Sequence, residues 1–372
     1  MSSRSWFAVL IGVTILCAPL SAAVYVSNVD DDTISVIDPA TNTVIQTISV
    51  GNEPRDLAST PSGDRIYVPN RHSDDVSVIS TATNTVSATI ADASFDEPYA
   101  AAVTSDGTEV WVVNKKGGGS TTGSVTIISV ATNMVTATID DPCFSSPEGI
   151  ALNAVSARAY VVNRESNTVC VVNTTTRTVL ASVDVGSRPR YAVVTPDGAS
   201  VYVSGSPIAK INTATNTPTL LADTAGRNMD INPAGTKVYV ARKSSGQVLI
   251  INTATDGVTA LTLTGASNPS GTYAVAVEPV TGRAYVTEED DDEVYVIDTA
   301  TDTQVTGAGL PIAVGRTPRA IAAAAAMVMP PAAPEAIPTL GRWGIVILIL
   351  LIAGVGLYFR NQGQSRHLAC RI

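Results

Sequence analysis

A repeat of about 43 residues runs through most of this 372-residue chain and constrains its fold more than any other feature. Two short sequences mark each copy, and in the first copy they are VYVSN at 24–28 and SVIDPATNT at 35–43. Both recur in altered form until each has appeared seven times. We expect one aromatic column to pack between neighbouring sheets, because flat rings bury much apolar area. Its members are Tyr25, Tyr67, Trp111, Tyr160, Tyr202, Tyr239 and Tyr285.

Each copy predicts four β-strands. In the copy that begins at Arg188, a first strand ends at the turn TPDG, 195–198, and a second strand carries Tyr202. A third strand leads into the polar turn NTATN, 212–216, and a fourth strand follows. Seven such units predict an all-β, seven-bladed β-propeller of four-stranded antiparallel blades. A β-solenoid is the alternative, but four unequal strands per copy and column spacings of 37 to 49 residues argue against it.

The first blade lacks one strand in the sequence around it, because the chain there supplies only the second, third and fourth strands. A propeller must join its ends or leave exposed strand edges. Residues 316–328, RTPRAIAAAAAMV, repeat the Pro-Arg start of other first strands, such as RPRYAVVTP at 188–196. We therefore predict that residues 317–326 form the innermost strand of the first blade. The five alanines leave a helix as the alternative, since alanine favours helices.

The repeat closely resembles the YVTN family of β-propeller repeats. The resemblance rests on VYVxN, VIDTATNT and the PRxxAVTPDG pattern between units, and it covers residues 24 to about 326. It implies a seven-bladed propeller domain, which we place at 24–329. The family is found in surface-layer and other exported proteins, so the resemblance also implies export.

The two ends of the chain predict where the protein goes. Residues 1–23 resemble a secretory signal peptide, with Arg4, an apolar run at 6–18 and the small residues 21–23 before the cleavage point. An uncleaved N-terminal anchor is the alternative. Residues 330–336 form a Pro/Ala linker, and 343–359 is an apolar run long enough for a transmembrane helix, followed by a basic tail that predicts a cytoplasmic C-terminus.

The segment 337–372 resembles the IPTL-CTERM sorting signal of Gram-negative bacteria. The residues that carry this resemblance are Ile337, Pro338, Thr339, Leu340, Trp343 and Gly344. The resemblance implies processing by a dedicated membrane sorting enzyme and display at the cell surface, after removal of the leader by signal peptidase. The tail NQGQSRHLACRI extends beyond the usual short basic end, and a plain C-terminal anchor is the alternative.

Charge and cysteine content exclude some partners. The formal net charge of −10, without a Lys/Arg cluster, argues against nucleic acid as a partner. Cys143 and Cys170 form either a disulfide, as an exported protein allows, or two buried thiols. His72 is the one histidine of the propeller, which rules out a histidine-based metal cluster, and no catalytic motif such as GxSxG or HExxH is present.

Acidic loops predict one candidate cation site. In a propeller the loops that lead into the first strand and those that join the second and third strands share one face, which we call the upper face. The first and seventh blades are neighbours, so their acidic loops should meet. A Ca²⁺ site is chemically reasonable there, although the loops lack calcium-loop spacing, and we prefer a solvated acidic rim. The aspartates are Asp30, Asp31, Asp32, Asp290, Asp291 and Asp292.

A second candidate site lies at the mouth of the central channel. Arg55, Arg190 and Arg319 follow a proline at the start of three first strands, and Tyr99 and Glu148 take the equivalent place in two others. An arginine-lined mouth could hold a carboxylate or another anion. In the alternative, which we prefer, each arginine pairs with a nearby loop carboxylate or backbone carbonyl.

These observations favour a non-catalytic module for binding, adhesion or surface architecture, anchored in the cell envelope by its C-terminal helix. A surface glycan or protein is the partner we expect, and no cofactor is required. The alternative is a propeller enzyme of lactonase or lyase type with its site at the channel mouth.

Overall fold

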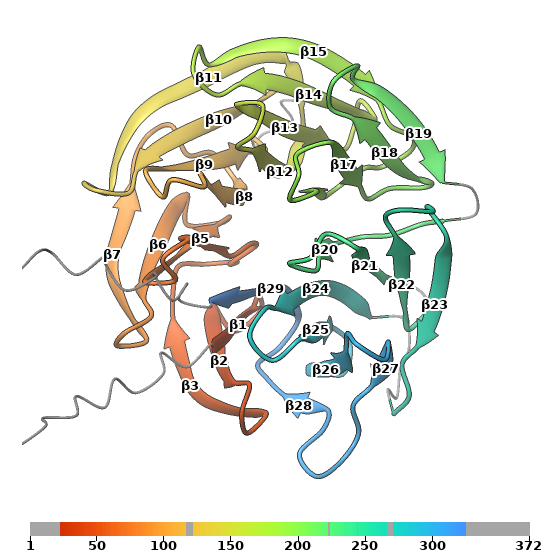
Figure 1. Cartoon of the computed structure of the whole chain (residues 1–372). Coiled ribbons are helices and arrows are strands. Elements are labelled where there is room, and N and C mark those ends of the chain that lie inside the picture. Colours follow the sequence, from red (N-terminus) through yellow and green to blue (C-terminus); the bar gives the residue numbers. More distant parts are fainter. Residues whose placement is uncertain (1–22, 117–121, 222–223, 244, 266–270, 325–372) are drawn as a thin grey trace, which may run out of the picture. The chain divides into compact units, whose positions relative to one another are not determined.

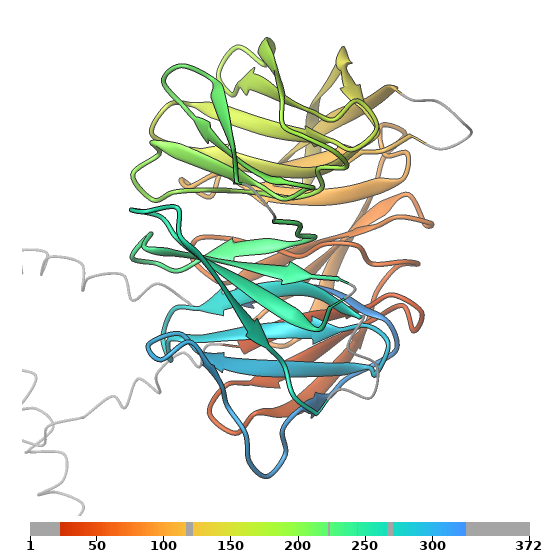
Figure 2. The ribbon, with the colours of Figure 1, turned by 90° about the vertical axis from the view of Figure 1, so that its right-hand side faces the viewer.

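The computed structural model describes residues 23–116, 122–221, 224–243, 245–265 and 271–324, and these form seven antiparallel sheets around a central axis (Figure 1). Each sheet is one blade with its strands ordered from the channel to the rim. The seven-bladed, all-β propeller predicted from the repeat is confirmed. Turning the molecule by 90° shows the twist of the blades, which strand sterics impose on any such sheet (Figure 2).

The first four blades use strands β29 and β1 to β15. Blade one contains β29 (Pro318–Ala324), β1 (Ala23–Asn28), β2 (Thr33–Asp38) and β3 (Thr43–Ser49). Blade two contains β4 (Ala58–Ser59), β5 (Arg65–Asn70), β6 (Asp75–Ser80) and β7 (Thr85–Ala91). Blade three contains β8 (Pro98–Val103), β9 (Glu109–Asn114), β10 (Thr122–Ser129) and β11 (Met134–Ser145). Blade four contains β12 (Pro147–Asn153), β13 (Arg158–Asn163), β14 (Thr168–Asn173) and β15 (Thr178–Asp184).

The remaining three blades use strands β16 to β28. Blade five contains β16 (Ala192–Val194), β17 (Ser200–Val203), β18 (Ile208–Asn212) and β19 (Thr217–Leu221). Blade six contains β20 (Met229–Ile231), β21 (Lys237–Arg242), β22 (Gln247–Asn252) and β23 (Val258–Thr262). Blade seven contains β24 (Thr272–Glu278), β25 (Arg283–Glu288), β26 (Glu293–Asp298) and β27 (Thr303–Gln304), and β28 (Ile312–Ala313) also pairs with β26.

The ring closes where the sequence predicts. Strand β29 lies antiparallel to β1, with Ala324 opposite Ala23 and Ala322 opposite Tyr25. The helical alternative for the alanine run is therefore wrong within the described part of that run. Small alanine side chains suit this strand, because it is the innermost strand of blade one and packs against blade seven on one side and blade two on the other. Ala23, the last residue of the predicted leader, is already the first residue of β1.

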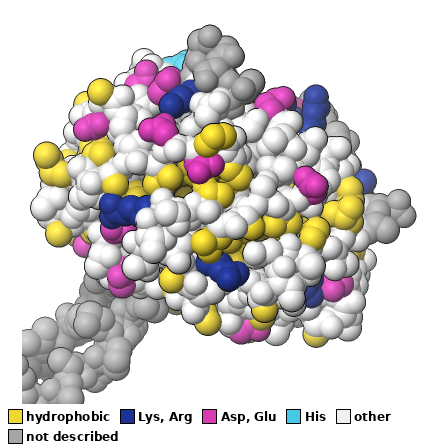
Figure 3. Space-filling view, turned by 90° about the horizontal axis from the view of Figure 1, so that it is seen from above, with side chains coloured by type: hydrophobic (Ala, Val, Ile, Leu, Met, Phe, Trp, Pro, Cys, Tyr) yellow, Lys and Arg dark blue, Asp and Glu magenta, His cyan; other side chains and the backbone are white. Residues whose placement is uncertain are grey.

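The aromatic column packs between blades as predicted, and all seven rings are fully buried. Each of the seven buried apolar clusters lies between two adjacent blades, for example Tyr25 with Ile66 and Val68 between blades one and two. The outermost strands alternate exposed and half-buried residues, so apolar side chains such as Leu180 are exposed. Hydrophobic side chains are accordingly visible among polar ones on one side of the molecule (Figure 3). Stability thus comes from the repeated junctions, not from one central core.

The two repeated sequences are linked by a hydrogen bond that crosses from blade to blade. The last asparagine or aspartate of the NTATN turn has a positive φ, which these two residue types tolerate better than most. At five of the seven junctions its side chain accepts the hydroxyl hydrogen of the preceding blade's tyrosine, as in Tyr25 to Asn84 at 2.6 Å and Tyr239 to Asp302 at 2.8 Å. The hydroxyl of Tyr160 has no hydrogen-bond partner among the described residues.

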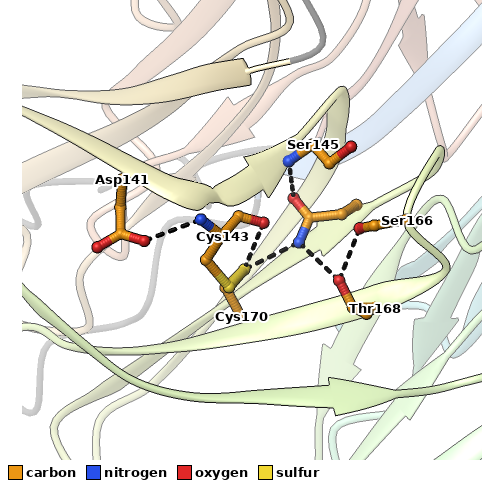
Figure 4. Close-up of a disulfide and its surroundings, with 7 residues drawn as sticks. Asp141, Cys143, Ser145, Ser166, Thr168 and Cys170 are labelled. Carbon is orange, nitrogen blue, oxygen red and sulfur yellow. Dashed lines mark hydrogen bonds between the residues drawn. A yellow bond between two sulfur atoms is a disulfide. The ribbon is translucent and has the colours of Figure 1, made fainter.

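Cys143 and Cys170 form a disulfide, which settles the choice that the sequence left open (Figure 4). The sulfur atoms lie 1.90 Å apart, and the bond joins β11 at the end of blade three to β14 in blade four. It closes a loop of 27 residues across one blade junction. A cross-link of this kind reduces the conformational freedom of the unfolded chain.

The predictions for the two ends of the chain lie outside the described residues. They are the leader before Ala23, the Pro/Ala linker at 330–336, the sorting motif at 337–344 and the helix at 343–359. Within the described ranges, no helix is long and apolar enough to span a membrane.

Candidate ligand-binding face

Seven side chains surround the mouth of the central channel, and we call them the mouth ring. In five blades the member follows a residue that pairs with the end of the second strand, as Pro98 pairs with Asn114 and Pro318 with Asn28. In blades five and six the N–H groups of Arg190 and Arg227 donate to the carbonyls of Ser204 and Ala241, near the same end of the second strand. The register therefore gives one mouth-ring residue per blade. The members are Arg55, Tyr99, Glu148, Arg190, Arg227, Tyr273 and Arg319. The five residues predicted from the sequence all belong to this ring, and Arg227 and Tyr273 complete it.

The backbone just before the mouth ring is held by the neighbouring blade. Glu53, Glu97, Arg188 and Thr317 each precede a proline and have a positive φ, an uncommon conformation for residues other than glycine. A carboxylate or amide from the preceding blade accepts the N–H of each at 2.8–2.9 Å. The acceptors are Asp32, Asp74, Asn167 and Asp292. This clamp fixes the loops that present the ring.

The predicted acidic patch is therefore largely a set of structural acceptors. Thr317 bridges the two acidic loops, since its N–H donates to Asp292 and its hydroxyl donates to Asp30 at 2.6 Å. Asp31 accepts from the Arg316 backbone and guanidinium, and these hydrogen bonds lower its pKa. The two loops meet at the seam between blades one and seven, as predicted. Among the described residues, however, no three acidic, histidine or cysteine side chains converge as a metal site.

The arginines predicted at the mouth each pair with a carboxylate, as the alternative interpretation stated. Arg55 bonds Glu53 at 2.8 Å, Arg319 bonds Glu289 at 2.8 Å, and Arg190 bonds Glu148 at 2.5 Å. Glu148 is almost fully buried and also binds Lys115 at 2.7 Å and lies 3.7 Å from Arg164. Arg164 also pairs with Glu165 at 2.9 Å, so these three cations have two carboxylate partners and one positive charge stays uncompensated in this part of the ring.

Tyr273 lies in the most positive part of the mouth ring. The Arg227 guanidinium stacks 3.9 Å from its ring and donates to its hydroxyl at 2.6 Å, and Arg319 lies 5.4 Å from the ring. Burial alone would raise the pKa of Tyr273, but the charges of Arg227 and Arg319 outweigh it and lower the pKa. Burial raises the pKa of Tyr99, where Tyr273 and Glu148 add to the shift. The pKa values of these two tyrosines of the mouth ring thus shift in opposite directions.

Two carboxyl groups, of Asp56 and Asp230, lie shortly after the mouth-ring residues Arg55 and Arg227 in the sequence. Asp56 accepts the N–H of Ala101 at 3.0 Å, and Asp230 accepts the N–H of Val277 at 2.7 Å, each from the next blade. Protein atoms surround both groups, and this burial raises each pKa to about 6. Both nevertheless keep some solvent-accessible surface, as expected for groups on the wall of a narrow channel. The sequence does not reveal either residue, because a single aspartate forms no motif with its neighbours.

A cavity of about 360 Å³ opens on the upper face between blades five and six. Five cationic side chains line it, together with small residues that include Gly205 and Gly226, and no carboxylate belongs to its described lining. The cations are Arg188, Arg190, Arg227, Arg242 and Lys243. In blades one to four, the residue equivalent to Gly205 or Arg242 is a buried asparagine that bonds the third strand, as Asn28 does to Ser35. The cavity therefore lies where the repeat changes.

Two other cavities carry less charge. One of about 290 Å³ is lined by Lys210 and Tyr202, whose polar atoms already bond Asp256 in the junction between blades five and six. Another, of about 380 Å³, lies at the seam between blades one and seven and includes Asp31 and Val314. Neither collects unpaired charge, so the cavity between blades five and six is the better candidate.

The fold and the mouth define the class of the protein as a seven-bladed β-propeller, and comparisons with known proteins agree. Residues 8–116, less than half of the chain, match the YNCE-like beta-propeller family, which supports the propeller part of the YVTN resemblance. A functionally unknown protein from Desulfotomaculum acetoxidans has a similar structure, with a TM-score of 0.66 and 18% identity over 81% of this chain and 99% of that one. A protein from Lactobacillus plantarum gives a TM-score of 0.65 and 15% identity over 82% and 99%. No curated protein matches significantly. At these identities the two structures show the fold alone.

Proposed function

We propose that the chain is an exported cell-envelope propeller that acts as a non-catalytic binding, adhesion or surface-architecture module, with its ligand site on the upper face. One observation carries the proposal. The aromatic column and the turn acceptors keep similar residue types from blade to blade, whereas the mouth ring changes among Arg, Tyr and Glu. Variable side chains held on a rigid scaffold are the usual setting of a binding site.

The proposed location follows from the ends of the chain and agrees with the disulfide, since disulfides persist in oxidising compartments. Signal peptidase would remove residues 1–23, the helix at 343–359 would hold the propeller outside the cytoplasm, and a sorting enzyme would read the motif at 337–344. Fractionation of the native bacterium, followed by protease treatment of intact cells, tests this. We expect an envelope-associated, protease-accessible propeller. A cytosolic protein with its leader intact would refute the proposal.

The proposed face is tested by a glycan and protein-partner screen with the full chain and two variants. Arg55→Gln and Arg319→Gln remove charges from the mouth ring and should weaken binding of the ligand that the screen identifies. Arg177→Gln is the control, because it removes an equal charge that pairs with Glu109 in the hairpins away from the upper face. Binding that survives both mouth-ring changes but is lost in the control would place the ligand on the other face.

The alternative, an enzyme of lactonase or lyase type, has one specific observation in its favour. A phenol whose pKa is lowered by a bonded guanidinium is suited to accept a proton, and Tyr273 meets this description. Tyr273→Phe would abolish turnover in such an enzyme while leaving ring stacking on Arg227 in place. A binding module would show no product with lactone or acidic-glycan substrates in either form.

A further inference from the structure

We propose that the cavity between blades five and six is an oxyanion-binding site, and that its ligand carries at least two carboxylate or phosphate groups. The inference rests on the proposed function, which places ligand binding on the upper face, and it adds the chemistry of the ligand.

Three of the five cations that line the cavity have no carboxylate partner among the described residues, whereas Arg190 pairs with Glu148 and Lys243 pairs with Glu289. Arg188 and Arg242 form no ion pair with any described carboxylate, and the Arg242 guanidinium bonds only the neutral amide of Gln247, at 3.1 Å. Arg227 donates to the Tyr273 hydroxyl and likewise has no described carboxylate partner. In a chain with a net charge of −10, three such guanidiniums around one cavity are not explained by the overall composition. Guanidinium groups bind carboxylate and phosphate oxygens in a bidentate geometry.

The lowered pKa of Lys243, which lines the cavity, agrees with a positive potential there. Desolvation lowers the pKa of Lys243, and repulsion from Arg227 and Arg319 lowers it further, while attraction to Tyr273 acts in the opposite direction. Crowding like charges in this way costs stability, and a bound anion would relieve the cost. Sites that combine poor stability with good function are common in natural proteins.

The cavity also has room for a ligand. Gly205, Ala225 and Gly226 line it together with the arginines, and Ser187 and Ser206 add neutral hydroxyls. A Cβ on Gly226 would lie 2.2 Å from the Val240 side chain, so a larger residue there would force a local shift. The cavity volume of about 360 Å³ lies within the range of small-ligand sites, roughly 300–1,000 Å³.

Positive charge beyond the cavity indicates how many anionic groups the ligand carries. It continues through Arg190 to the cluster in which Lys115, Arg164 and Arg190 contact Glu148, and Glu165 compensates only one of these charges, that of Arg164. Arg190 belongs both to the cavity and to this cluster. A ligand with one charge would fill the cavity and leave the cluster unbound, whereas an acidic oligosaccharide or a phosphorylated ligand could contact both. We therefore assign the cavity to one anionic group and the cluster to the next.

The test uses the full chain with defined probes, by calorimetry at about 20 mM salt, where surface charges are weakly screened. The probes are inorganic phosphate, galacturonate, trigalacturonate and the neutral galactotriose. We expect trigalacturonate to bind at least about tenfold more tightly than galacturonate, with an affinity that falls with salt, and galactotriose not to bind. Phosphate that binds more tightly than galacturonate would identify a phosphorylated ligand, and the reverse would identify a sugar acid. Both outcomes support the oxyanion site.

The decisive variant is the double change Arg188→Gln and Arg242→Gln, with Arg177→Gln as the control. Neither cavity arginine has a described carboxylate partner, so the double variant should fold with a melting temperature equal to or above that of the parent. Its affinity for the anionic probes should fall by about tenfold or more, whereas the control keeps the parent affinity. Equal affinity in the double variant, or no binding of any anionic probe by the parent, would overturn the inference. A neutral ligand that responds to Arg55→Gln would keep the proposed function and reject this inference alone.

Discussion

The aromatic column offers an internal experiment, because its six tyrosines share one position but differ in their hydroxyl contacts. The Tyr239 hydroxyl donates to the Asp302 carboxylate at 2.8 Å, and that of Tyr285 donates to Asn42 at only 3.4 Å. The Tyr160 hydroxyl has no described partner, although its ring is equally buried. A change from tyrosine to phenylalanine removes only the hydroxyl, so the column separates the energy of the hydrogen bond from that of ring burial.

The expected magnitudes follow from these contacts. A hydrogen bond to a charged group contributes about 1.5–3 kcal/mol, and removing its donor costs least when the acceptor keeps another partner. Lys237 still binds Asp302 at 2.7 Å in the variant Tyr239→Phe, so we expect a loss of about 1–2 kcal/mol in the free energy of unfolding. Tyr160→Phe removes a buried hydroxyl without a described partner and should be neutral or slightly stabilising. Tyr285→Phe should fall between the two.

Urea unfolding of the full chain, followed by tryptophan fluorescence, measures the differences as shifts of the midpoint at constant slope. We expect Tyr160→Phe to be the most stable variant, Tyr285→Phe to be intermediate and Tyr239→Phe to be the least stable. If Tyr160→Phe destabilised the protein as much as Tyr239→Phe, the hydrogen bonds from the tyrosine hydroxyls to the turn residues would not contribute to stability between blades. That result would refute the stabilising role of these hydrogen bonds.

Three further perturbations have expected outcomes. Replacing both Cys143 and Cys170 by serine should cost about 3 kcal/mol, seen as a lower melting temperature that reductant no longer changes. Because burial raises the pKa of Asp56 to about 6, the folded state binds a proton that the unfolded state releases, so its contribution to stability is present below about pH 4 and is lost as pH rises through 6. Asp56→Asn can still accept the Ala101 N–H, and it should raise stability at pH 7 and flatten the pH dependence between 4 and 6. Ending the chain before Pro318 should expose the edge of β1, and chromatography should then show an unfolded or oligomeric protein instead of a stable monomer.

The fold could be predicted because the repeat specifies it seven times. Tyr25 and its equivalents identify the second strands, the NTATN turns identify the hairpins, and the Pro-Arg start of 318–319 identifies the closing strand. The hydrogen bond between Tyr25 and Asn84 could not be predicted, because it depends on the turn residue adopting a positive φ and pointing at the neighbouring blade. A single copy of the repeat gives no information about such a contact between copies.

The candidate site could be predicted only in part. Arg55, Arg190 and Arg319 follow a proline, but Gly226 precedes Arg227 and Thr272 precedes Tyr273, so the motif that reveals the ring is absent in blades six and seven. The sequence could not show that Asp31, Asp32 and Asp292 accept hydrogen bonds from backbone N–H groups across the blade seams, because contacts between blades leave no pattern in the sequence.

The positions that lose the repeated asparagine explain why the cavity opens where it does. In blades one to four, the asparagine after the aromatic strand is buried and bonds side chains of the third strand, as Asn70 bonds Ser77, and this network fills the space beside the mouth. Blade five has Gly205 at this position, which removes the side chain, and blade six has Arg242, which brings a charge in its place. The missing side chain at Gly205 leaves space, and the guanidinium of Arg242 adds positive charge, so both occur at the junction between blades five and six. The scaffold tolerates both changes because the column and turn contacts of those blades, such as Tyr202 with Asp256, are kept. Departures from the repeat therefore mark the proposed ligand site, and agreement with it marks the scaffold.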